Sequence, residues 1–465
     1  MKRILFYLMA GTLILVMVVA CKKDVIPAEE EEPDILLPAE TLATNEWIFE
    51  NMSLYYLWND YMPKNIDYTL EKDPGVYFQK LKYKPKDKWS YITSNYEALA
   101  GELIGEPVTM GYQPAFYLAG NNNVIIVVSY VYPGSSAFEA GLKRGDIILS
   151  INNMPMDTIN YYNMFSGDLY SVQLGTLDGN TLIETGQSLN LAARNMKTDP
   201  SIHHEVLNID GNKIGYLAYV EFISGENNEF LTEMDNIFTE FKAEGISDLV
   251  IDLRYNSGGD SEATIHLASL IAPTAVTTGN EIMVSLRYNK DLQEYLEYYK
   301  YTNYLYYRFE STASNVNMQR VYFLTTSRSA SASELLITGL DPYMNVVRIG
   351  ESTYGKYVGA WVMPDDNKKW AIMPIVTKYA NANGYTDFEN GLAPDYMIKD
   401  NLFTARPFGD ASDPMLAKAI ELITGKGMPS RKALVPDTER FKQIVPERMR
   451  LRENLIIPSI KFQVE

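Results

Sequence analysis

The chain has 465 residues, a formal net charge of −18 and 46% hydrophobic residues. This length predicts two or three domains, and the composition is typical of a globular protein. The negative charge argues against binding to a nucleic-acid backbone, which requires clustered lysines and arginines. The single cysteine excludes an intrachain disulfide framework, and the three histidines argue against a metal site built from imidazoles. We therefore expect no metal and no cofactor.

Residues 1–21 have the form of a bacterial secretion signal. Two basic residues precede an apolar run that ends at the lone cysteine, Cys21. The run is short for a membrane-spanning helix, which needs about 20 residues. The ending VVAC resembles a lipobox, which implies cleavage before Cys21 and a lipid attached to that residue. The alternative is an ordinary signal peptide in which the cysteine stands by chance.

A tether and a helical region are expected next. Residues 22–39 form an acidic linker, because the run of glutamates from 29 to 32 cannot be buried and its charges repel one another. The charged start KKD resembles, weakly, signals that send lipoproteins of Bacteroides-type bacteria to the cell surface. Residues 40–100 predict a small helical domain, because NEWIFENMSLYYLW has apolar residues at helical spacing and no glycine or proline.

Residues 101–196 predict a β-rich domain. The stretch VIIVVSYV is rich in β-branched residues, a Pro-Gly turn follows it, and Ser135 and Ser136 can cap a short helix that ends at Gly141. AFEAGLKRGDIILSIN resembles PDZ domains of the bacterial periplasmic type. That resemblance implies that a peptide adds to the sheet as a strand and that a loop receives its terminal carboxylate. Here that loop would lie near Met110 and contain Gly111, Tyr112 and Gln113.

Residues 197–425 alternate between strand and helix patterns, which predicts an α/β layer architecture. KIGYLAYVEF, SDLVIDLR, RVYFLTT, NVVRIG and AWVMP are expected to be strands, and EFLTEMDNIFTEFKAEG a helix ended by Gly245. His203 and His204 fall in a polar stretch before the first of these strands. Residues 426–465 are polar and contain several prolines, and the sequence assigns them no domain.

Lys356 lies in GESTYGKYVG, which fits the phosphate-binding pattern G-x-x-x-x-G-K. A phosphate loop needs a serine or threonine after the lysine and then a helix, whereas Tyr357 and a predicted strand follow here. Glu351 would also place negative charge at the phosphate. These features argue against nucleotide binding. The aromatic surroundings instead favour a lysine whose pKa burial lowers from about 10.4, so that it could act as a base.

A candidate nucleophile lies upstream, where the strand RVYFL leads into TTSRSASASELLITGL. A serine at a helix N-terminus has backbone N–H groups beside it that can stabilise a developing oxyanion, although such serines can also serve only as helix caps. A serine nucleophile needs a base. No G-x-S-x-G occurs, so the histidines have no local signature, but a triad that uses His266 stays open because triads assemble in space.

Three motifs together, SRSASASE, GESTYGK and DLRYNSGGD, resemble the C-terminal processing peptidases, also called tail-specific proteases. The resemblance covers roughly residues 100–425 and includes the PDZ domain ahead of the catalytic core. It implies that Ser331 is the nucleophile and that Lys356, in a T-x-G-K motif, is the general base. Glu334 would hold nearby backbone or side chains in place.

The same resemblance implies an oxyanion hole made by the amide of Ala332 and a glycine amide, either that of Gly258 or that of Gly259. For Asp252 and Arg254 we expect structural roles. Many members of the family carry a glutamine four positions after the lysine, where it helps to orient the ammonium group. This chain has Ala360 there, so another group, such as a tyrosine, must position the lysine.

The expected fold is therefore α+β, with an N-terminal helical domain, a PDZ-like β-rich domain and an α/β, crotonase-like peptidase core. The predicted segments are a lipoprotein signal (1–21), an acidic linker (22–39), the helical domain (40–100), the PDZ domain (101–196), the catalytic core (197–425) and a C-terminal extension (426–465). The expected location is the bacterial cell envelope, anchored to the outer membrane on its periplasmic or its surface face.

The predicted function is that of a serine endopeptidase that cleaves secreted or envelope proteins near their C-terminal tails, with peptide or protein substrates and no nucleotide or nucleic acid. One alternative is a catalytically weak or inactive lipoprotein that binds peptides through the PDZ domain and the cleft. Ala360 and the unusual PDZ loop motivate it. A second alternative is a different hydrolase that uses His266.

Overall fold

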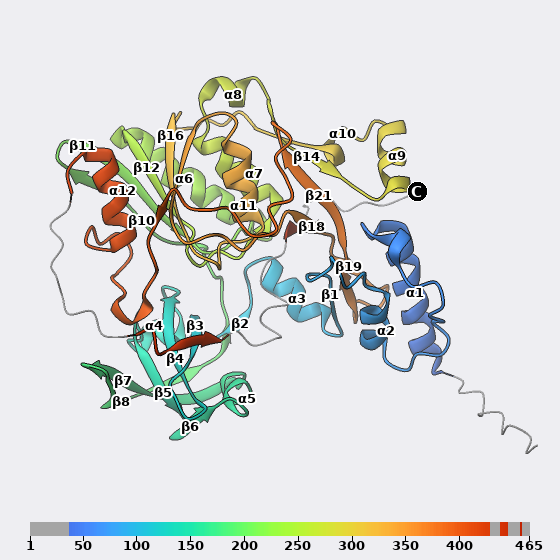
Figure 1. The fold of residues 1–465 in the computed structure, drawn as a ribbon, viewed down its shortest axis with the longest axis horizontal. Helices are drawn as coiled ribbons and strands as arrows, with labels where there is room; N and C mark the ends of the chain where they lie inside the picture. The colour runs from blue at the N-terminus through green and yellow to red at the C-terminus, as the bar shows by residue number, and fades with distance from the viewer. Residues whose placement is uncertain (1–36, 428–437, 445–455, 458–465) are drawn as a thin grey trace, which may run out of the picture.

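The computed structural model describes residues 37–427 and 438–444, and the backbone alone of residues 456–457. Figure 1 shows a group of N-terminal helices and a β-rich domain, both placed against a larger body of strands and helices. Cys21, most of the acidic linker and much of the C-terminal extension lie outside the described residues.

The N-terminal part contains the predicted helices but shares its core with the large body. Its elements are α1 (Ala39–Tyr55), the 3-10 turn η1 (Asn59–Tyr61), α2 (Pro74–Leu81), β1 (Tyr91–Thr93) and α3 (Tyr96–Leu103). Apolar side chains of α1 and α2, such as Ile48 and Phe78, belong to one hydrophobic cluster with strands and helices of the body. In addition, β1 pairs with β20 (Ala371–Met373). This part therefore forms a wall of the body.

The β-rich domain has a seven-stranded sheet and a hydrophobic cluster of its own. Its elements are β3 (Tyr112–Leu118), β4 (Asn123–Val131), α4 (Ser136–Glu139), β5 (Ile147–Ile151), β6 (Met154–Asp157), α5 (Tyr161–Phe165), β7 (Leu169–Asp178) and β8 (Thr181–Ala192), with β23 (Lys442–Ile444) at one edge. The short strands β2 (Val108–Thr109) and β9 (Arg194–Asn195) pair with each other at its junction with the body. Of the two serines expected to cap α4, Ser135 does so by accepting the N–H of Phe138, and Ser136 is the first residue of the helix.

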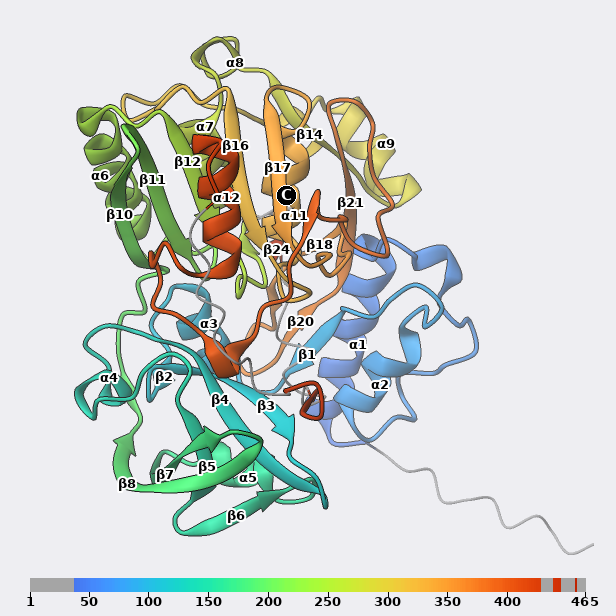
Figure 2. The same ribbon diagram turned by 60° about the vertical axis from the view of Figure 1, so that its left-hand side comes forward.

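The body is built on a six-stranded sheet. Its order is β10 (Ser201–Ile209), β11 (Asn212–Tyr219), β12 (Asp248–Asp252), β16 (Arg320–Thr325), β17 (Asn345–Gly350) and β22 (Tyr396–Met397), and all neighbours are parallel except β10 and β11. Side chains alternate between the two faces, so Ile251 and Phe323 pack toward α6 (Glu229–Glu244), α7 (Ser261–Ile271) and α11 (Ala332–Leu340). Val250 and Tyr322 pack toward α12 (Pro414–Thr424), which crosses the opposite face in Figure 2.

A second, four-stranded sheet lies beside α11. Its order is β15 (Tyr306–Arg308), β14 (Ile282–Arg287), β21 (Ile375–Asn381) and β18 (Val358–Ala360). The remaining elements are β13 (Gly259–Asp260), α8 (Thr274–Thr278), α9 (Lys290–Tyr298), α10 (Thr302–Leu305), β19 (Met363–Pro364), the 3-10 turn η2 (Leu402–Thr404) and β24 (Ile456–Ile457). The α/β architecture expected for the body is confirmed. The histidines at 203 and 204, expected before the strands, lie within β10, and the stretch AWVMP is divided between β18 and β19.

A buried ion-pair network fixes the carboxyl end of β12. Arg254 is 2% exposed, and its guanidinium donates to Asp252 at 2.6 Å and to Asp413, the N-cap of α12, at 2.8 Å. Asp400 lies 3.3 Å from the same guanidinium. A buried arginine needs such acceptors, because an unpaired charge in the interior is costly. These contacts support the structural role expected for Asp252 and Arg254.

Candidate active site

Ser331 sits where β16 turns into α11, as the N-cap residue of that helix. Its backbone has φ 58° and ψ −110°, and the residue is fully buried. A positive φ is rare for a residue other than glycine, and such conformations gather at functional sites, where the surrounding structure enforces them. Within the described part of the chain, its Oγ has no hydrogen-bond partner. The hydroxyl is therefore held at the start of a helix, and no described group engages it in a hydrogen bond.

Lys356 lies between β17 and β18 and is also fully buried. Burial lowers the pKa of its ammonium group from 10.5 to about 7, and the carboxylates of Asp87 and Glu334 partly oppose that shift. Among the described residues, its Nζ has no hydrogen-bond partner. A lysine with a pKa near 7 is substantially neutral at physiological pH and can accept a proton.

Glu334 joins the segments that carry Ser331 and Lys356. Its Oε2 accepts the backbone N–H of both residues, each at 2.8 Å. Its Oε1 accepts the N–H of Gly355 at 2.6 Å and the hydroxyl of Thr353 at 2.5 Å. Burial raises the pKa of Glu334, and these four donors oppose the rise by stabilising the carboxylate. The supporting role expected for Glu334 thus has a definite geometry, because one carboxylate fixes both backbones.

Tyr379, on β21, adds a second connection. Its hydroxyl lies 3.4 Å from the carbonyl oxygen of Ser331 and 3.3 Å from that of Lys356. Ala360, which occupies the position of the family's glutamine, is buried in β18. The hydroxyl of Tyr379 contacts the main chain of Lys356, whereas the glutamine would act on the ammonium group. That a tyrosine replaces the glutamine therefore stays a prediction, because no described group hydrogen-bonds Lys356 Nζ.

The two candidate oxyanion glycines differ in what their amides do. The N–H of Gly258 donates to Asn256 Oδ1 at 2.9 Å. Phe222 accepts from Asp260 N–H and donates to the carbonyl of Gly258, so the backbone groups on either side of Gly259 point toward Phe222. Because N–H directions alternate along an extended chain, the N–H of Gly259 points to the other side. This geometry favours Gly259 over Gly258 as the oxyanion donor.

Only a glycine fits at position 259. Its φ is 133°, and a Cβ there would lie 2.1 Å from the carbonyl oxygen of Phe222. Ala332, the other expected donor, is the first residue of α11, where helix N–H groups have no intrahelical acceptor. The sheet topology explains why these parts converge: the glycine, serine and lysine segments follow three adjacent parallel strands, β12, β16 and β17, whose carboxyl ends share one edge.

Asp87 is a residue at this site that the sequence did not reveal. It is 5% exposed, and its carboxylate accepts the hydroxyl of Tyr56 and the N–H groups of Trp89 and Ser90. It acts electrostatically on Lys356, whose pKa it raises. Its segment belongs to the N-terminal part, and no local motif marks it. Only the packing of that part against the body brings this charge toward the lysine.

The histidines lie on other elements and are each placed near an acidic side chain. His203 and His204, on β10, lie 3.0 Å from Glu205 and 3.7 Å from Glu240. His266, on α7, lies 3.3 Å from Asp235. The described residues that hydrogen-bond the backbone of Ser331 include no histidine. Over the same described ranges, no group of three or more histidine, cysteine or acidic residues is placed to hold a metal ion.

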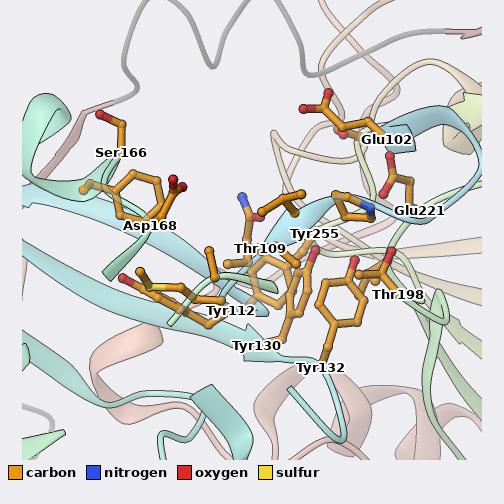
Figure 3. A pocket seen from close by; sticks show the side chains of 18 of the residues that line it. Glu102, Thr109, Tyr112, Tyr130, Tyr132, Ser166, Asp168, Thr198, Glu221 and Tyr255 are labelled. Atoms are coloured by element: carbon orange, nitrogen blue, oxygen red, sulfur yellow. The ribbon is translucent and has the colours of Figure 1, made fainter. Parts of the chain in front are cut away.

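A cavity of about 460 Å³ lies between the PDZ-like domain and the body (Figure 3). Two of the three predicted loop residues line it, Tyr112 and Gln113, together with residues of the body such as Glu221 and Ser257. Gly111 is not among its lining residues, and its N–H donates to Thr109 Oγ1 at 3.0 Å. Burial raises the pKa of Glu221 to about 8, and the nearby Glu102, visible beside it in Figure 3, adds to the shift.

Comparisons with known proteins agree with this architecture. Family models match residues 213–398 (peptidase family S41), 43–91 (peptidase S41 N-terminal domain) and 127–168 (PDZ domain). A carboxyl-terminal-processing protease of Synechocystis is 24% identical over 70% of this chain and 69% of its own length, and the carboxy-terminal processing protease CtpA of Bacillus subtilis is 23% identical over 62% and 56%. The solved structure of an S41 protease from Bacteroides fragilis has a TM-score of 0.69 and 27% identity, covering 82% of this chain and 97% of that one.

Replacing the glutamate that ties the two segments should reduce activity strongly. In Glu334→Gln, an amide NH₂ replaces one oxygen that accepts two N–H or O–H donors, so at least one buried donor loses its partner. We expect kcat to fall by about 10² or more, and stability by about 1–3 kcal/mol. The measurements are steady-state proteolysis and urea unfolding. The same exchange at the exposed Glu294 of α9 is the matched control, and a Glu334→Gln enzyme with parental kcat would contradict this role.

Removing the buried amine should stabilise the protein while it abolishes activity. The folded-state pKa of Lys356, about 7, lies below its unfolded value of 10.5, so protonation favours the unfolded state. That penalty is fully present below about pH 7 and disappears as the pH rises toward 10.5. Lys356→Met should therefore gain on the order of a few kcal/mol at pH 6 and much less at pH 10. Urea unfolding at both pH values tests this, with Lys290→Met, at an exposed site, as the control. A gain that does not depend on pH would contradict it.

Proposed function

The chain belongs to peptidase family S41, the serine peptidases that include the carboxyl-terminal processing proteases, and from this premise we propose a Ser331–Lys356 dyad that cleaves peptide bonds. The observation that carries the proposal is the pair of hydrogen bonds from both backbones to Glu334 Oε2. They hold a hydroxyl and an amine, each buried and unpartnered among the described residues, on adjacent segments.

The proposed reaction begins with neutral Lys356. Its amine takes the proton of Ser331 Oγ as that oxygen attacks the carbonyl carbon of the substrate, and the amides of Gly259 and Ala332 stabilise the resulting oxyanion. The protonated lysine then gives its proton to the leaving amine as the C–N bond breaks. Water attacks the acyl-enzyme, with Lys356 again as the base, which releases the carboxylate product and restores the serine. Every step uses groups of the chain, the substrate and water.

The proposed substrates are secreted or envelope proteins, cleaved near their C-terminal tails. The names of the relatives support the tail preference, and the PDZ domain supplies a surface that can hold an extended peptide. The cavity lined by Tyr112 and Gln113 reaches Ser257 in the glycine-bearing loop of the body, so a peptide bound there would lead toward the site. Because the N–H of Gly111 already donates to Thr109 Oγ1, the terminal carboxylate of such a peptide would be bound by other groups.

A second candidate is a peptide-binding protein with weak or no catalysis. Ala360 in place of the family's glutamine favours it, because no described group hydrogen-bonds Lys356 Nζ. A hydrolase that uses His266 has no comparable support. His266, on α7, lies beside Asp235 of α6.

We also propose attachment to the cell envelope through a lipid on Cys21. The signal-like segment and its terminal cysteine support this, and both lie outside the described residues. Across the ranges that the structure describes, no helix has the length and apolar character needed to cross a membrane.

The dyad is tested by incubating residues 25–465 with an unfolded protein, beside the variants Ser331→Ala and Lys356→Ala. We expect cleavage by the parent alone, at a rate that rises with pH through about 7 as Lys356 loses its proton. Equal cleavage by all three proteins would refute the dyad. No cleavage by any of them, with peptide binding retained, would favour the second candidate.

The anchor is tested in cells that produce the full chain. Wild-type protein should fractionate with membranes and incorporate a labelled fatty acid, whereas Cys21→Ser should lose the label. A control variant, Ser53→Ala, should keep it, since it changes a hydroxyl far from the signal. Labelling of the Cys21→Ser protein to the wild-type extent would show that the lipid is attached elsewhere.

A further inference from the structure

Two described strands belong to the C-terminal extension, to which the sequence assigned no domain. They are β23 (Lys442–Ile444) and β24 (Ile456–Ile457). The first pairs with the PDZ-like domain and the second with the glycine segment of the candidate active site. The two places that a peptide substrate would use are thus both contacted by one stretch of the chain itself.

β23 lies on the sheet edge where a peptide ligand would add. In the sheet order, β3 is flanked by β4 on one side and β23 on the other, so without β23 it would be an edge strand. The pairing is antiparallel, with Lys442 opposite Leu118 and Ile444 opposite Phe116. β23 therefore runs toward the loop that contains Tyr112. A peptide whose terminal carboxylate enters that loop must run in the same direction.

Side chains anchor β23 in this position. Phe441 is 7% exposed, and its ring stacks on Phe403 of η2 with the centroids 4.7 Å apart. Just before it, the hydroxyl of Thr438 accepts the side-chain amide of Asn401 at 3.0 Å. The guanidinium of Arg440 donates to the carbonyl of Asn180, in the turn between β7 and β8. The extension is thus bound both to the body and to the PDZ-like domain before it reaches β3.

β24 lies on the polar backbone edge of the candidate oxyanion glycine. Ile456 pairs in parallel with Gly259, and Ile457 with Asp260. The groups flanking Gly259 already bind Phe222, so the N–H and C=O of Gly259 itself face β24. β24 also lies close to β18, which follows Lys356. The backbone of β24 thus lies against the N–H of Gly259, which the proposed reaction needs.

We propose that the C-terminal extension is an intramolecular pseudosubstrate that covers the PDZ strand edge with β23 and the oxyanion glycine with β24. Its inhibitory effect on cleavage rests on the proposed peptidase function, whereas its occupation of the PDZ edge does not. Because the segment is tethered, its effective concentration at these sites is on the order of millimolar. A substrate tail must displace it, so activity depends on competition with the enzyme's own chain.

Two shortened chains separate the two contacts. A chain ending at Ile444 keeps β23 and lacks β24, and a chain ending at Asp437 lacks both. The parent is the full-length protein in detergent, with intact mass measured to verify that its tail is present. We expect the chain ending at Ile444 to cleave an unfolded protein at least about 5-fold faster than the parent. A synthetic peptide of residues 445–465, added in excess, should slow it again.

A binding measurement decides the PDZ contact without any catalysis. In the Ser331→Ala background, a labelled peptide of residues 438–465 should bind the chain ending at Asp437 at least about 10-fold more tightly than the full-length chain, whose sites are occupied. If this difference in affinity is found but none of the chains cleaves protein, the peptidase proposal fails. The proposal that the extension covers the PDZ strand edge is then still supported. Equal cleavage rates together with equal peptide affinities would overturn the pseudosubstrate.

A full-length variant guards against a folding defect in the shortened chains. Phe441→Ala removes the ring that stacks on Phe403 and should loosen β23, raising peptide affinity toward that of the chain ending at Asp437. Phe441→Leu keeps most of the apolar contact and should stay near the parent. Circular dichroism verifies that each protein is folded. Parental affinity in a folded Phe441→Ala protein would count against anchoring of the extension at this edge.

Discussion

The arrangement of the candidate active site depends on one buried carboxylate. Glu334 lies in the first turn of α11, where its side chain reaches back to the N–H of Ser331 and across to the loop that carries Lys356. The serine and the lysine come from segments after different strands, and neither side chain has a hydrogen-bond partner among the described residues. Their relation is therefore imposed through the backbone. A buried carboxylate is tolerated here because four donors stabilise its charge.

The low pKa of Lys356 depends on its burial, and that burial depends on parts of the chain that are distant in sequence. Lys356 has no exposed surface, which is what lowers the pKa of its amine. The N-terminal part contributes to this enclosure: the ring of Trp89 meets that of Tyr357, and Asp87 supplies a charge that limits the fall in pKa. The segment before the PDZ domain is thus part of the environment of Lys356, which agrees with the hydrophobic cluster that it shares with the body.

Backbone edges that a peptide could pair with connect the candidate active site to the C-terminal extension. A peptide substrate must find free N–H and C=O groups on the protein, and such groups also attract any other extended segment. Both β3 and Gly259 present such groups, and both are paired with strands of the C-terminal extension. These two strands of the chain would therefore compete with an extended peptide for the same backbone groups. Recognition and restraint would then use the same backbone geometry.

The features that could be predicted from the sequence are those whose signals are local. Hydrophobic periodicity and turn residues predicted a β-rich domain, strands of the body and the helix ended by Gly245, and the resemblance to known families predicted the PDZ domain and the peptidase core. These are confirmed, except that the expected strand AWVMP is divided between β18 and β19. Ser331 and Lys356 were named from motifs and remain predictions as catalytic residues. Other features depend on contacts between distant segments and appear only in the tertiary structure: the backbone contacts that favour Gly259 over Gly258 as the candidate donor, the charge of Asp87 that acts on Lys356, and the strands of the extension. No local pattern encodes these, because each arises only when segments far apart in the chain pack together.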